Sequence, residues 1–290
     1  MKLISRVAVA ALLLAPAAQA QTPDGLMKQD AATSGATDVA SSGFEAPVTP
    51  PEEAKDTTEA DISAGALLTT GNARSLSATS AGKFRLRRAV NQFSAAASIN
   101  YARSAASPDD DVETTVENYQ GKLRYDRFVS GSFAVFLALS ARRDRFQGLD
   151  LRLNLDPGVA YYFVDDKKQQ LWAELGYDLQ YDVRRDENIT AAALDGTVLD
   201  KAETRHNGRA FAGYSNDVSE TVSFNTGVEF LKDVETSENW RLNWDAALSS
   251  SIGSGFSVAT TFSLKYDNNP LPKVKTTDTV TAISLVYKLL

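Results

Sequence analysis

The chain has 290 residues, with 30 Lys and Arg against 37 Asp and Glu, so its net charge is −7, and it contains no cysteine. An acidic chain is poorly suited to nucleic acid, whose phosphates require a basic face, and the missing cysteines exclude disulfides, thiolate metal sites and a lipid-modified cysteine. The mean hydropathy is −0.25, and after residue 20 no segment approaches 18 consecutive apolar residues, which excludes a helical membrane protein.

The first twenty residues have the three parts of a secretory signal peptide. Lys2 and Arg6 supply positive charge, residues 7–15 form a short apolar stretch, and Ala18-Gln19-Ala20 offers a cleavage site of small residues. The apolar stretch is shorter than the roughly 20 residues that a transmembrane helix needs. We therefore expect residues 1–20 to be a signal peptide that directs export through the Sec pathway.

Residues 21–59 differ in composition from the rest of the chain. They are rich in Ala, Ser, Thr, Pro and acidic residues and contain few large apolar side chains. Such a segment cannot bury enough apolar surface to offset the entropy lost on ordering. We expect a disordered, low-complexity periplasmic linker; a tether or a partner-binding tail is the functional alternative.

From residue 60 to 290 the sequence alternates between apolar and polar residues in strand-length segments. In the segment 169–184, for example, Leu171, Leu175 and Leu179 alternate with Trp172 and Asp178. Counting segments with this period of two predicts about twelve strands. The expected strands are 61–70, 74–88, 91–103, 114–127, 132–145, 149–164, 169–184, 203–215, 219–233, 238–251, 255–267 and 277–290.

Alternation by itself fits both a soluble sandwich and a membrane barrel. Two features favour the barrel. Several segments reach about 14 residues, whereas strands of soluble proteins usually have about 5–6. Aromatic residues such as Tyr161, Trp240 and Tyr287 also lie toward strand ends, as in the interfacial girdles of outer-membrane barrels. The expected fold class is therefore all-β, a transmembrane antiparallel up-and-down β-barrel of about 12 strands, preceded by the signal peptide and the linker.

The connections between the expected strands alternate in length. Every second connection is short, such as Val129-Ser130-Gly131, whereas most of the others are longer, such as 104–113 and 185–202. Outer-membrane barrels have short periplasmic turns and longer external loops. This parity places both chain ends on the periplasmic side of the outer membrane. The first hairpin, Thr70-Gly71-Asn72-Ala73, is the exception, since it is tight although it should be external.

That first hairpin carries a family resemblance. The stretch from Gly65 through Thr70-Gly71-Asn72 to Ser77 resembles the opening of the DUF481 family of salt-induced outer-membrane proteins, and the segment 277–289 is similar to that family's last strand. The resemblance covers roughly residues 60–290 and implies a barrel with no catalytic residues to carry over. The end of the chain departs from the usual pattern, in which a single aromatic residue closes the last strand, because Leu289 holds that position and Leu290 follows it.

His206, at the start of the expected strand 203–215, and an acidic triple in the connection 104–113 are two further candidate sites. His206, the only histidine, could activate a hydroxyl as in an outer-membrane phospholipase, but no Gly-x-Ser-x-Gly motif and no serine two residues away accompanies it. The acidic triple Asp109-Asp110-Asp111 could bind calcium, but it lacks the glycine and final glutamate of an EF-hand loop. We therefore expect no catalytic residues, no cofactor and no metal.

The polar face offers the strongest functional signal. A charge that faces hydrocarbon is costly, so the charged side chains of the strands should point into the lumen. Basic residues gather on early strands and acidic ones on later strands, which should place the two signs on opposite arcs of the interior. The lumen-lining candidates are Lys83, Arg85, Lys122, Arg124, Arg142, Glu174, Asp178, Asp182, Glu229 and Asp245. A barrel of eight strands is filled by its side chains, and one of 16–18 strands encloses an open channel. Twelve strands lie between these cases, so the sequence is compatible with a plugged barrel and with a pore.

The closing strand supplies candidates for assembly. Leu285, Tyr287 and Leu289 form an apolar face that should contact lipid and dock with the barrel-assembly machinery. The expected protein is a monomer in the outer membrane, in contact with outer-membrane lipid and lipopolysaccharide, and not an enzyme. Its expected role is structural or stress-responsive, with or without a narrow charged pore. The alternatives are a lipid-modifying enzyme and a surface protein that binds through its loops.

Overall fold

The computed structural model describes residues 56–69, 74–105, 111–144, 148–166, 168–194, 196, 198–270 and 276–289. The expected signal peptide, residues 1–20, lies outside the described residues, and so do residues 21–55 of the expected linker. The barrel begins at Thr57, a few residues before the predicted boundary at residue 60. The last residues assigned to the linker are therefore part of the first strand.

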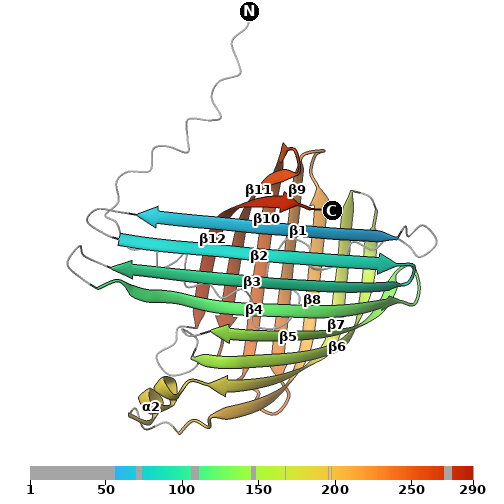
Figure 1. The fold of residues 1–290 in the computed structure, drawn as a ribbon. Helices are drawn as coiled ribbons and strands as arrows, with labels where there is room; N and C mark the ends of the chain where they lie inside the picture. Colours follow the sequence, from blue (N-terminus) through green and yellow to red (C-terminus); the bar gives the residue numbers. More distant parts are fainter. Residues whose placement is uncertain are drawn as a thin grey trace, which may run out of the picture.

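Twelve antiparallel strands close into a barrel in which each strand pairs with its neighbours in sequence. Figure 1 shows them winding round one interior. The first and last strands close the barrel through a register that runs from Asp61 with Lys288 to Ala64 with Leu285. The strands are β1 Thr57–Thr69, β2 Arg74–Arg88, β3 Asn91–Ala105, β4 Glu113–Phe128, β5 Phe133–Asp144, β6 Leu149–Asp165, β7 Gln169–Arg184, β8 Ala202–Asp217, β9 Val222–Asp233, β10 Trp240–Gly253, β11 Phe256–Asp267 and β12 Thr277–Lys288. The predicted barrel of twelve strands is confirmed.

One element was not predicted. A short helix, α2, spans Asp186–Leu194 inside the connection between β7 and β8, where the sequence suggested only a loop. Asp186 and Glu187 occupy its first turn, where negative charge complements the helix dipole, and three successive alanines, Ala191 to Ala193, favour helix. Among the described residues, no helix is long and apolar enough to cross a membrane.

Side chains alternate between the two faces of the barrel wall. On β5 the buried positions run from Ala134 and Phe136 to Arg142, while the intervening Leu137 and Leu139 are about half exposed. The inward face is thus largely polar and the outward face apolar. This is the reverse of a soluble domain, in which exposed apolar area of this extent would be costly. The wall is built to contact hydrocarbon rather than water.

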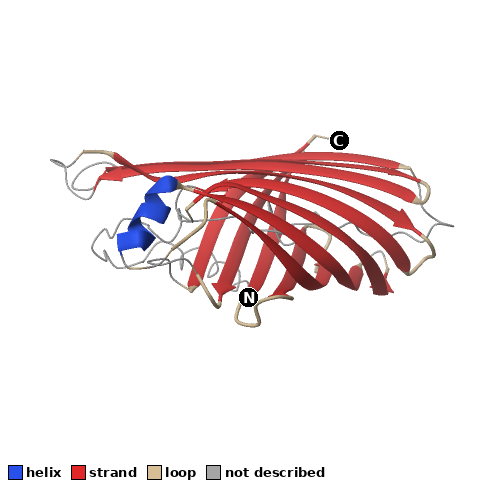
Figure 2. Ribbon diagram, turned by 90° about the horizontal axis from the view of Figure 1, so that it is seen from below, coloured by secondary structure: helices blue, strands red, loops and turns tan. Residues whose placement is uncertain are grey.

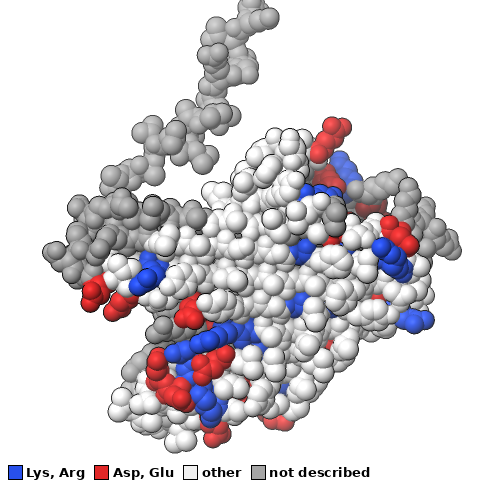
Figure 3. Space-filling model, in the orientation of Figure 1, with Lys and Arg blue, Asp and Glu red and all other residues white. Residues whose placement is uncertain are grey.

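The outward apolar face extends round the barrel. Exposed large apolar side chains occur from Ile62 on β1 to Leu285 on β12, with Leu123, Leu155 and Leu175 between them. In Figure 3 the side of the wall that faces the viewer is mostly free of charge, and Lys, Arg, Asp and Glu gather toward its ends. A band without charge between two charged rims is the exterior that a bilayer requires.

The two ends of the barrel differ. The short turns join β2 to β3, β4 to β5, β6 to β7, β8 to β9 and β10 to β11 at one end, where β1 also begins and β12 ends. In the turn between β10 and β11, three successive residues, Gly253 to Gly255, adopt positive φ, and glycine tolerates this conformation well. Helix α2 lies at the other end, as Figures 1 and 2 show.

An aromatic cluster fills part of the interior near the short turns. Phe128, Phe136, Tyr162, Trp172 and Phe211 pack together with two alanines. The rings of Tyr162 and Trp172 stack with centroids 6.4 Å apart.

Glycines on the inner wall make room for two of these rings. A Cβ at Gly213 would lie 2.3 Å from Cζ2 of Trp172, and one at Gly158 would lie 2.4 Å from Cζ of Phe136. Both distances are far shorter than a van der Waals contact, so a residue larger than glycine would displace the ring or the strand. The cluster is therefore an apolar core inside a barrel whose other inward residues are mainly polar.

Candidate functional site

Many inward side chains of β4 to β10 are charged or amide groups, and we term this set the charged wall; the aromatic cluster lies on the same strands. Its geometry follows from the period of two, because every second residue on these strands points inward. Eight of the ten lumen-lining candidates are buried there: Lys122, Arg124, Arg142, Glu174, Asp178, Asp182, Glu229 and Asp245. Lys83 and Arg85, on β2, are only partly buried.

A chain of ion pairs crosses the middle of the charged wall. Arg124 contacts Asp126 at 2.8 Å and Glu174 at 2.9 Å. Arg209 continues the chain, with its Nη1 2.8 Å from Glu174 and its Nε 2.7 Å from Glu229. Beyond Glu229, Asn243 Nδ2 donates a hydrogen bond of 2.9 Å to the other carboxylate oxygen. These contacts join β4, β7, β8, β9 and β10 through their side chains.

Arg124 reaches Glu174 because the two intervening strands carry small side chains. Ala138 on β5 is in register with Arg124, and Ala160 on β6 is in register with Glu174. The Arg124 guanidinium lies 4.0 Å from the centre of the Phe136 ring, a cation–π contact. The ion pairs therefore lie directly on the aromatic cluster, where the low dielectric strengthens their mutual attraction.

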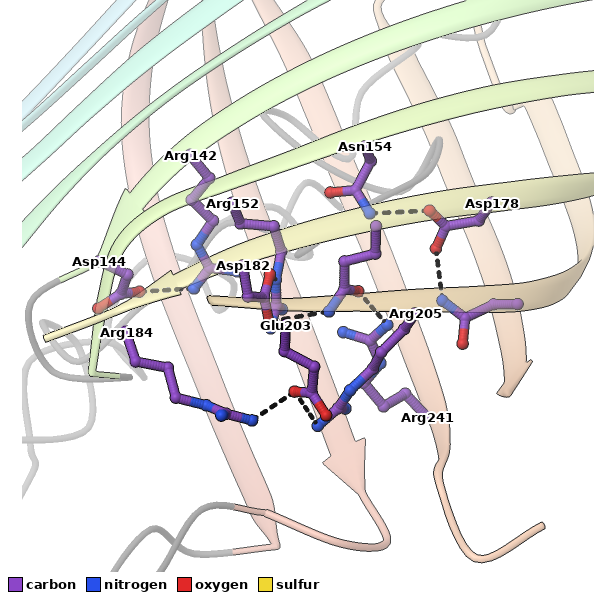
Figure 4. A network of polar contacts seen from close by, with 12 residues as sticks. Arg142, Asp144, Arg152, Asn154, Asp178, Asp182, Arg184, Glu203, Arg205 and Arg241 are labelled. Atoms are coloured by element: carbon purple, nitrogen blue, oxygen red, sulfur yellow. Dashed lines mark hydrogen bonds and ion pairs between the residues drawn. The ribbon is translucent and has the colours of Figure 1, made fainter. Parts of the chain in front are cut away.

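A second network lies nearer the long loops (Figure 4). Arg152 and Asp182 form two parallel hydrogen bonds of 2.6 Å, the bidentate geometry that binds carboxylates most strongly. Gln180 donates to Asp182 at 2.9 Å and accepts a hydrogen bond from Arg241. The network thus connects β6 and β7 to β10 across the interior.

Further ion pairs occur at the rim of the same end. Arg142 pairs with Asp144 at 2.5 Å, and Asn118 donates to Asp144 at 2.9 Å. Glu203 on β8 accepts from both Arg184 and Arg205. Bases and acids therefore neutralise one another along the charged wall instead of facing an open lumen.

The remaining strands present a different inner surface. Their inner face carries some long side chains, among them Lys83, Arg85, Asn100 and Lys265. Many of the other inward residues midway along β11, β12, β1, β2 and β3 are small, and we term these the small-residue wall. It consists of Ser63, Gly65, Thr79, Ala81, Ala96, Ser98, Ala259, Thr261 and Ser284. Thr79 and Ala81 are partly exposed and Ala96, Ser98 and Ala259 are buried, whereas on β5 the inward residues from Ala134 to Asp144 are all buried. The bulky side chains are thus concentrated on one side of the interior.

A cavity of about 570 Å³ opens at the short-turn end, beside β8 to β11. Its lining includes the hairpin turn from Asp217 to Thr221, together with Lys168 and the serines Ser223, Ser249 and Ser257. In the neighbouring turn, the backbone N–H groups of Lys168 and Gln169 donate to the Asp166 carboxylate and lower its pKa. This cavity is a polar mouth at one end of the interior.

A family model described as "Protein of unknown function, DUF481" matches residues 62–289. The chain belongs to the DUF481 family. The resemblance inferred from the first hairpin and the last strand is therefore confirmed, and it extends over the whole barrel.

Solved barrels resemble this DUF481 chain only remotely. The NanC porin has 9% identity and a TM-score of 0.48, covering 80% of this chain and 100% of the porin. The KdgM porin in complex with disordered oligogalacturonate has 7% identity and a TM-score of 0.40, with coverage of 81% and 100%. The NalP autotransporter translocator domain from Neisseria meningitidis has 13% identity and a TM-score of 0.39, with coverage of 80% and 87%. No curated protein matches the chain.

The DUF481 barrel distributes its charges differently from the sequence-based grouping, which placed bases and acids on opposite arcs. Arg124 contacts Glu174 directly. Arg152 and Arg209 lie among the acids, and Asp126 lies among the bases. Arg152, Arg209 and Asp126 follow the same alternation as the lumen-lining candidates, because the residues before and after each of them face outward. The sequence did not reveal which side chains would meet across two or three strands.

The structure describes His206, but only Asp111 of the acidic triple. His206 Nδ1 shares a hydrogen bond with the Tyr177 hydroxyl on the outward face, so its bonded partner is a phenol rather than a serine. Of the acidic triple, Asp109 and Asp110 lie outside the described residues. Within the described part of the chain, no group of three or more His, Asp or Glu side chains is placed to hold a metal ion.

The assembly candidates lie at the end of the closing strand. Leu285, Tyr287 and Leu289 are exposed, whereas Ser284 and Val286, which alternate with Leu285 and Tyr287, are partly buried. Tyr287 also packs on Phe256 of β11, with ring centroids 4.7 Å apart. The backbone N–H of Leu289 donates to Ala60 of β1 at 2.8 Å, so the last residues take part in closing the barrel.

Proposed function

We propose that this protein is an outer-membrane barrel with a narrow water-filled path along its small-residue wall. The single observation that carries the proposal is the asymmetry of the interior. Aromatic rings and most of the ion pairs occupy the side of β4 to β10, whereas midway along β11, β12 and β1 to β3 many inward positions carry only a hydroxyl, a methyl group or a glycine, with Lys83, Arg85 and Lys265 beside them. An eight-stranded barrel is just filled by its own side chains, and a twelve-stranded barrel encloses a wider interior. The path is therefore confined to one side of the lumen.

The path should conduct weakly. Long charged side chains are held in ion pairs on both sides of the interior: Arg85 pairs with Glu59 beside the path, and a chain runs from Asp126 through Arg124 and Glu174 to Arg209 opposite it. Their charges largely cancel within the charged wall. Small ions should therefore pass without a strong preference for sign, and large solutes should not pass.

The membrane location and orientation belong to the same proposal. The uncharged outward band supports contact with outer-membrane lipid, including lipopolysaccharide in the outer leaflet. Short turns are typical of the periplasmic end of such barrels, so β1 would begin and β12 would end in the periplasm. The exposed face of Leu285 and Tyr287 supports docking with the assembly machinery. Closure of all strands within one chain supports a monomer.

Cysteine accessibility tests the path directly, because the native chain has no cysteine. Thr79→Cys places a thiol on the small-residue wall, and Ala138→Cys places one on the charged wall. In planar bilayers, a charged methanethiosulfonate reagent should reduce the current through Thr79→Cys and leave Ala138→Cys unchanged. If the reagent changes the current of both variants equally, or changes neither although both conduct, the path does not run along the small-residue wall.

A further inference from the structure

Three buried hydroxyl groups on the small-residue side of the lumen have no hydrogen-bond partner among the described residues. Ser98, which belongs to the small-residue wall, is 6% exposed, and its Oγ has no partner. The same is true of Ser94 on β3, which is 2% exposed, and of Ser263 on β11, which is 7% exposed. A buried polar atom without a partner costs free energy, so such atoms are rare. These hydroxyls point to a polar occupant on this side of the interior.

The side chains around Ser98 are short. Ser63, Ala81 and Ser98 lie in one register row across β1, β2 and β3, and Gly65 is in register with Thr79. A glycine inside a strand often marks a place where another backbone comes close. A hydroxyl can both donate and accept a hydrogen bond, so it can bind either the N–H or the C=O of an extended chain. The wall therefore suits a polypeptide segment with small side chains.

The chain itself contains a segment of this kind. Residues 31–43 are Ala, Ser, Thr and Gly apart from Asp38 and Val39, so none of their side chains is large. Asp38 carries the only charge, so little charge has to lose water inside the lumen. An extended run of this length reaches about 43 Å. It matches the length of β1, which has 13 residues.

The connection to the barrel brings this run to the correct end. Residues 44–55 join it to β1, which begins at Thr57 beside the short turns and lies between β12 and β2 of the small-residue wall. Such a connection spans up to about 40 Å. The cavity of about 570 Å³ opens at the same end. A short tether gives its segment an effective concentration on the order of millimolar, so weak contacts are enough to bind it.

We propose that residues 31–43 enter the lumen from the short-turn end and bind along the small-residue wall. The inference rests on the path of the proposed function, because the segment occupies that path and reduces the current through it. The backbone of the segment bonds Ser98 and its neighbouring hydroxyls. Because the segment is tethered at one end only, it can leave the wall, and the barrel then conducts.

Disulfide trapping tests this contact without any measurement of current, because the native chain has no cysteine. In the refolded full chain, Ser98→Cys is combined with one cysteine in the run and oxidised with copper phenanthroline. The three partners tested in turn are Ala32→Cys, Ala36→Cys and Ala40→Cys. Peptide mass spectrometry should find an intramolecular disulfide in at least one pair. Ala81→Cys replaces Ser98→Cys if that variant fails to fold.

Ala138→Cys is the matched control, since Ala138 is also buried and inward-facing but lies on the charged wall. It should form no disulfide with the same three partners. Absence of a disulfide with both Ser98→Cys and Ala81→Cys, or equal trapping by Ala138→Cys, would overturn the inference and would leave water or a free solute as the occupant.

Deletion of residues 31–43 supplies a second readout. It should raise the single-channel current at least twofold, whereas deletion of residues 21–30, which keeps the run and its connection, should leave the current unchanged. An unchanged current after the first deletion, in a barrel that conducts, would overturn the inference. A disulfide in a barrel that conducts neither with nor without the run would support the contact and refute the proposed path. Conduction without any disulfide would do the reverse.

Discussion

At the scale of single residues, the interior depends on exact partners rather than on general polarity. Arg209 is buried and bonds two glutamates from two different strands. A buried ion pair adds little net stability, but removing one partner leaves a charge that nothing compensates. The sequence identified Glu174 and Glu229 as inward-facing. It could not identify Arg209 as their shared partner, because that contact depends on how far the side chains reach across β7, β8 and β9.

Substitution of Arg209 by Met should therefore be costly. It leaves the carboxylates of Glu174 and Glu229 without their arginine, and we expect a loss of about 3–5 kcal/mol in the free energy of unfolding. Lys201→Met is the control, since Lys201 forms only exposed ion pairs with Asp150 and Asp186 and should change stability little. Urea titration of both refolded variants, followed by tryptophan fluorescence, measures the difference. Equal stability of the two variants would contradict the account of the charged wall.

The glycine beneath Trp172 permits a second test at this scale. Gly213→Ala places a methyl group 2.3 Å from the indole ring, so either the ring or the strand must shift, at a cost of about 1–3 kcal/mol. Gly208→Ala on the same strand is the control, because its nearest neighbour is 3.9 Å away. The same urea titration should separate the two variants. A destabilised Gly208→Ala with a native-like Gly213→Ala would show that the aromatic cluster is placed wrongly.

At the scale of elements, the period of two predicted the strands well because lipid on one side and a polar interior on the other impose strict alternation. Predicted and observed ranges agree fully for 74–88 and 169–184. Helix α2 was missed because it is a single short element within a loop, without the amphipathic period that marks longer helices. The start of β1 was missed because Thr57 to Glu59 resemble the polar segment before them.

The closing strand allows a prediction about assembly. Leu285 is 46% exposed on the outward face, and an arginine facing lipid costs about 2–4 kcal/mol near the midplane and less near the interface. Leu285→Arg should therefore reduce the amount of folded, heat-modifiable barrel in outer-membrane fractions. Lys288→Glu, at the end of the strand, should be tolerated. Equal depletion by both substitutions would show that this face of β12 does not contact lipid.

At the scale of the whole molecule, the orientation in the membrane can be tested by labelling. Ala193 is exposed on α2, at the end opposite the short turns, and Ser130 is exposed in the turn between β4 and β5. On intact cells, Ala193→Cys should react with an impermeant thiol reagent and Ser130→Cys should not. Ala192, the neighbour of Ala193, is buried and would be a poor choice. The opposite labelling pattern would invert the proposed orientation.

The central claim is that the interior conducts along the small-residue wall, and single-channel recording of two neighbouring variants tests it most directly. Thr79 faces inward and donates a hydrogen bond to Asn100 at 2.6 Å, whereas Ser80, the next residue, faces outward. The native barrel should show a small, weakly selective conductance. Thr79→Trp should reduce it strongly, and Ser80→Trp should leave it unchanged. Absence of conductance in the native barrel, or an unchanged current in Thr79→Trp, would contradict the account.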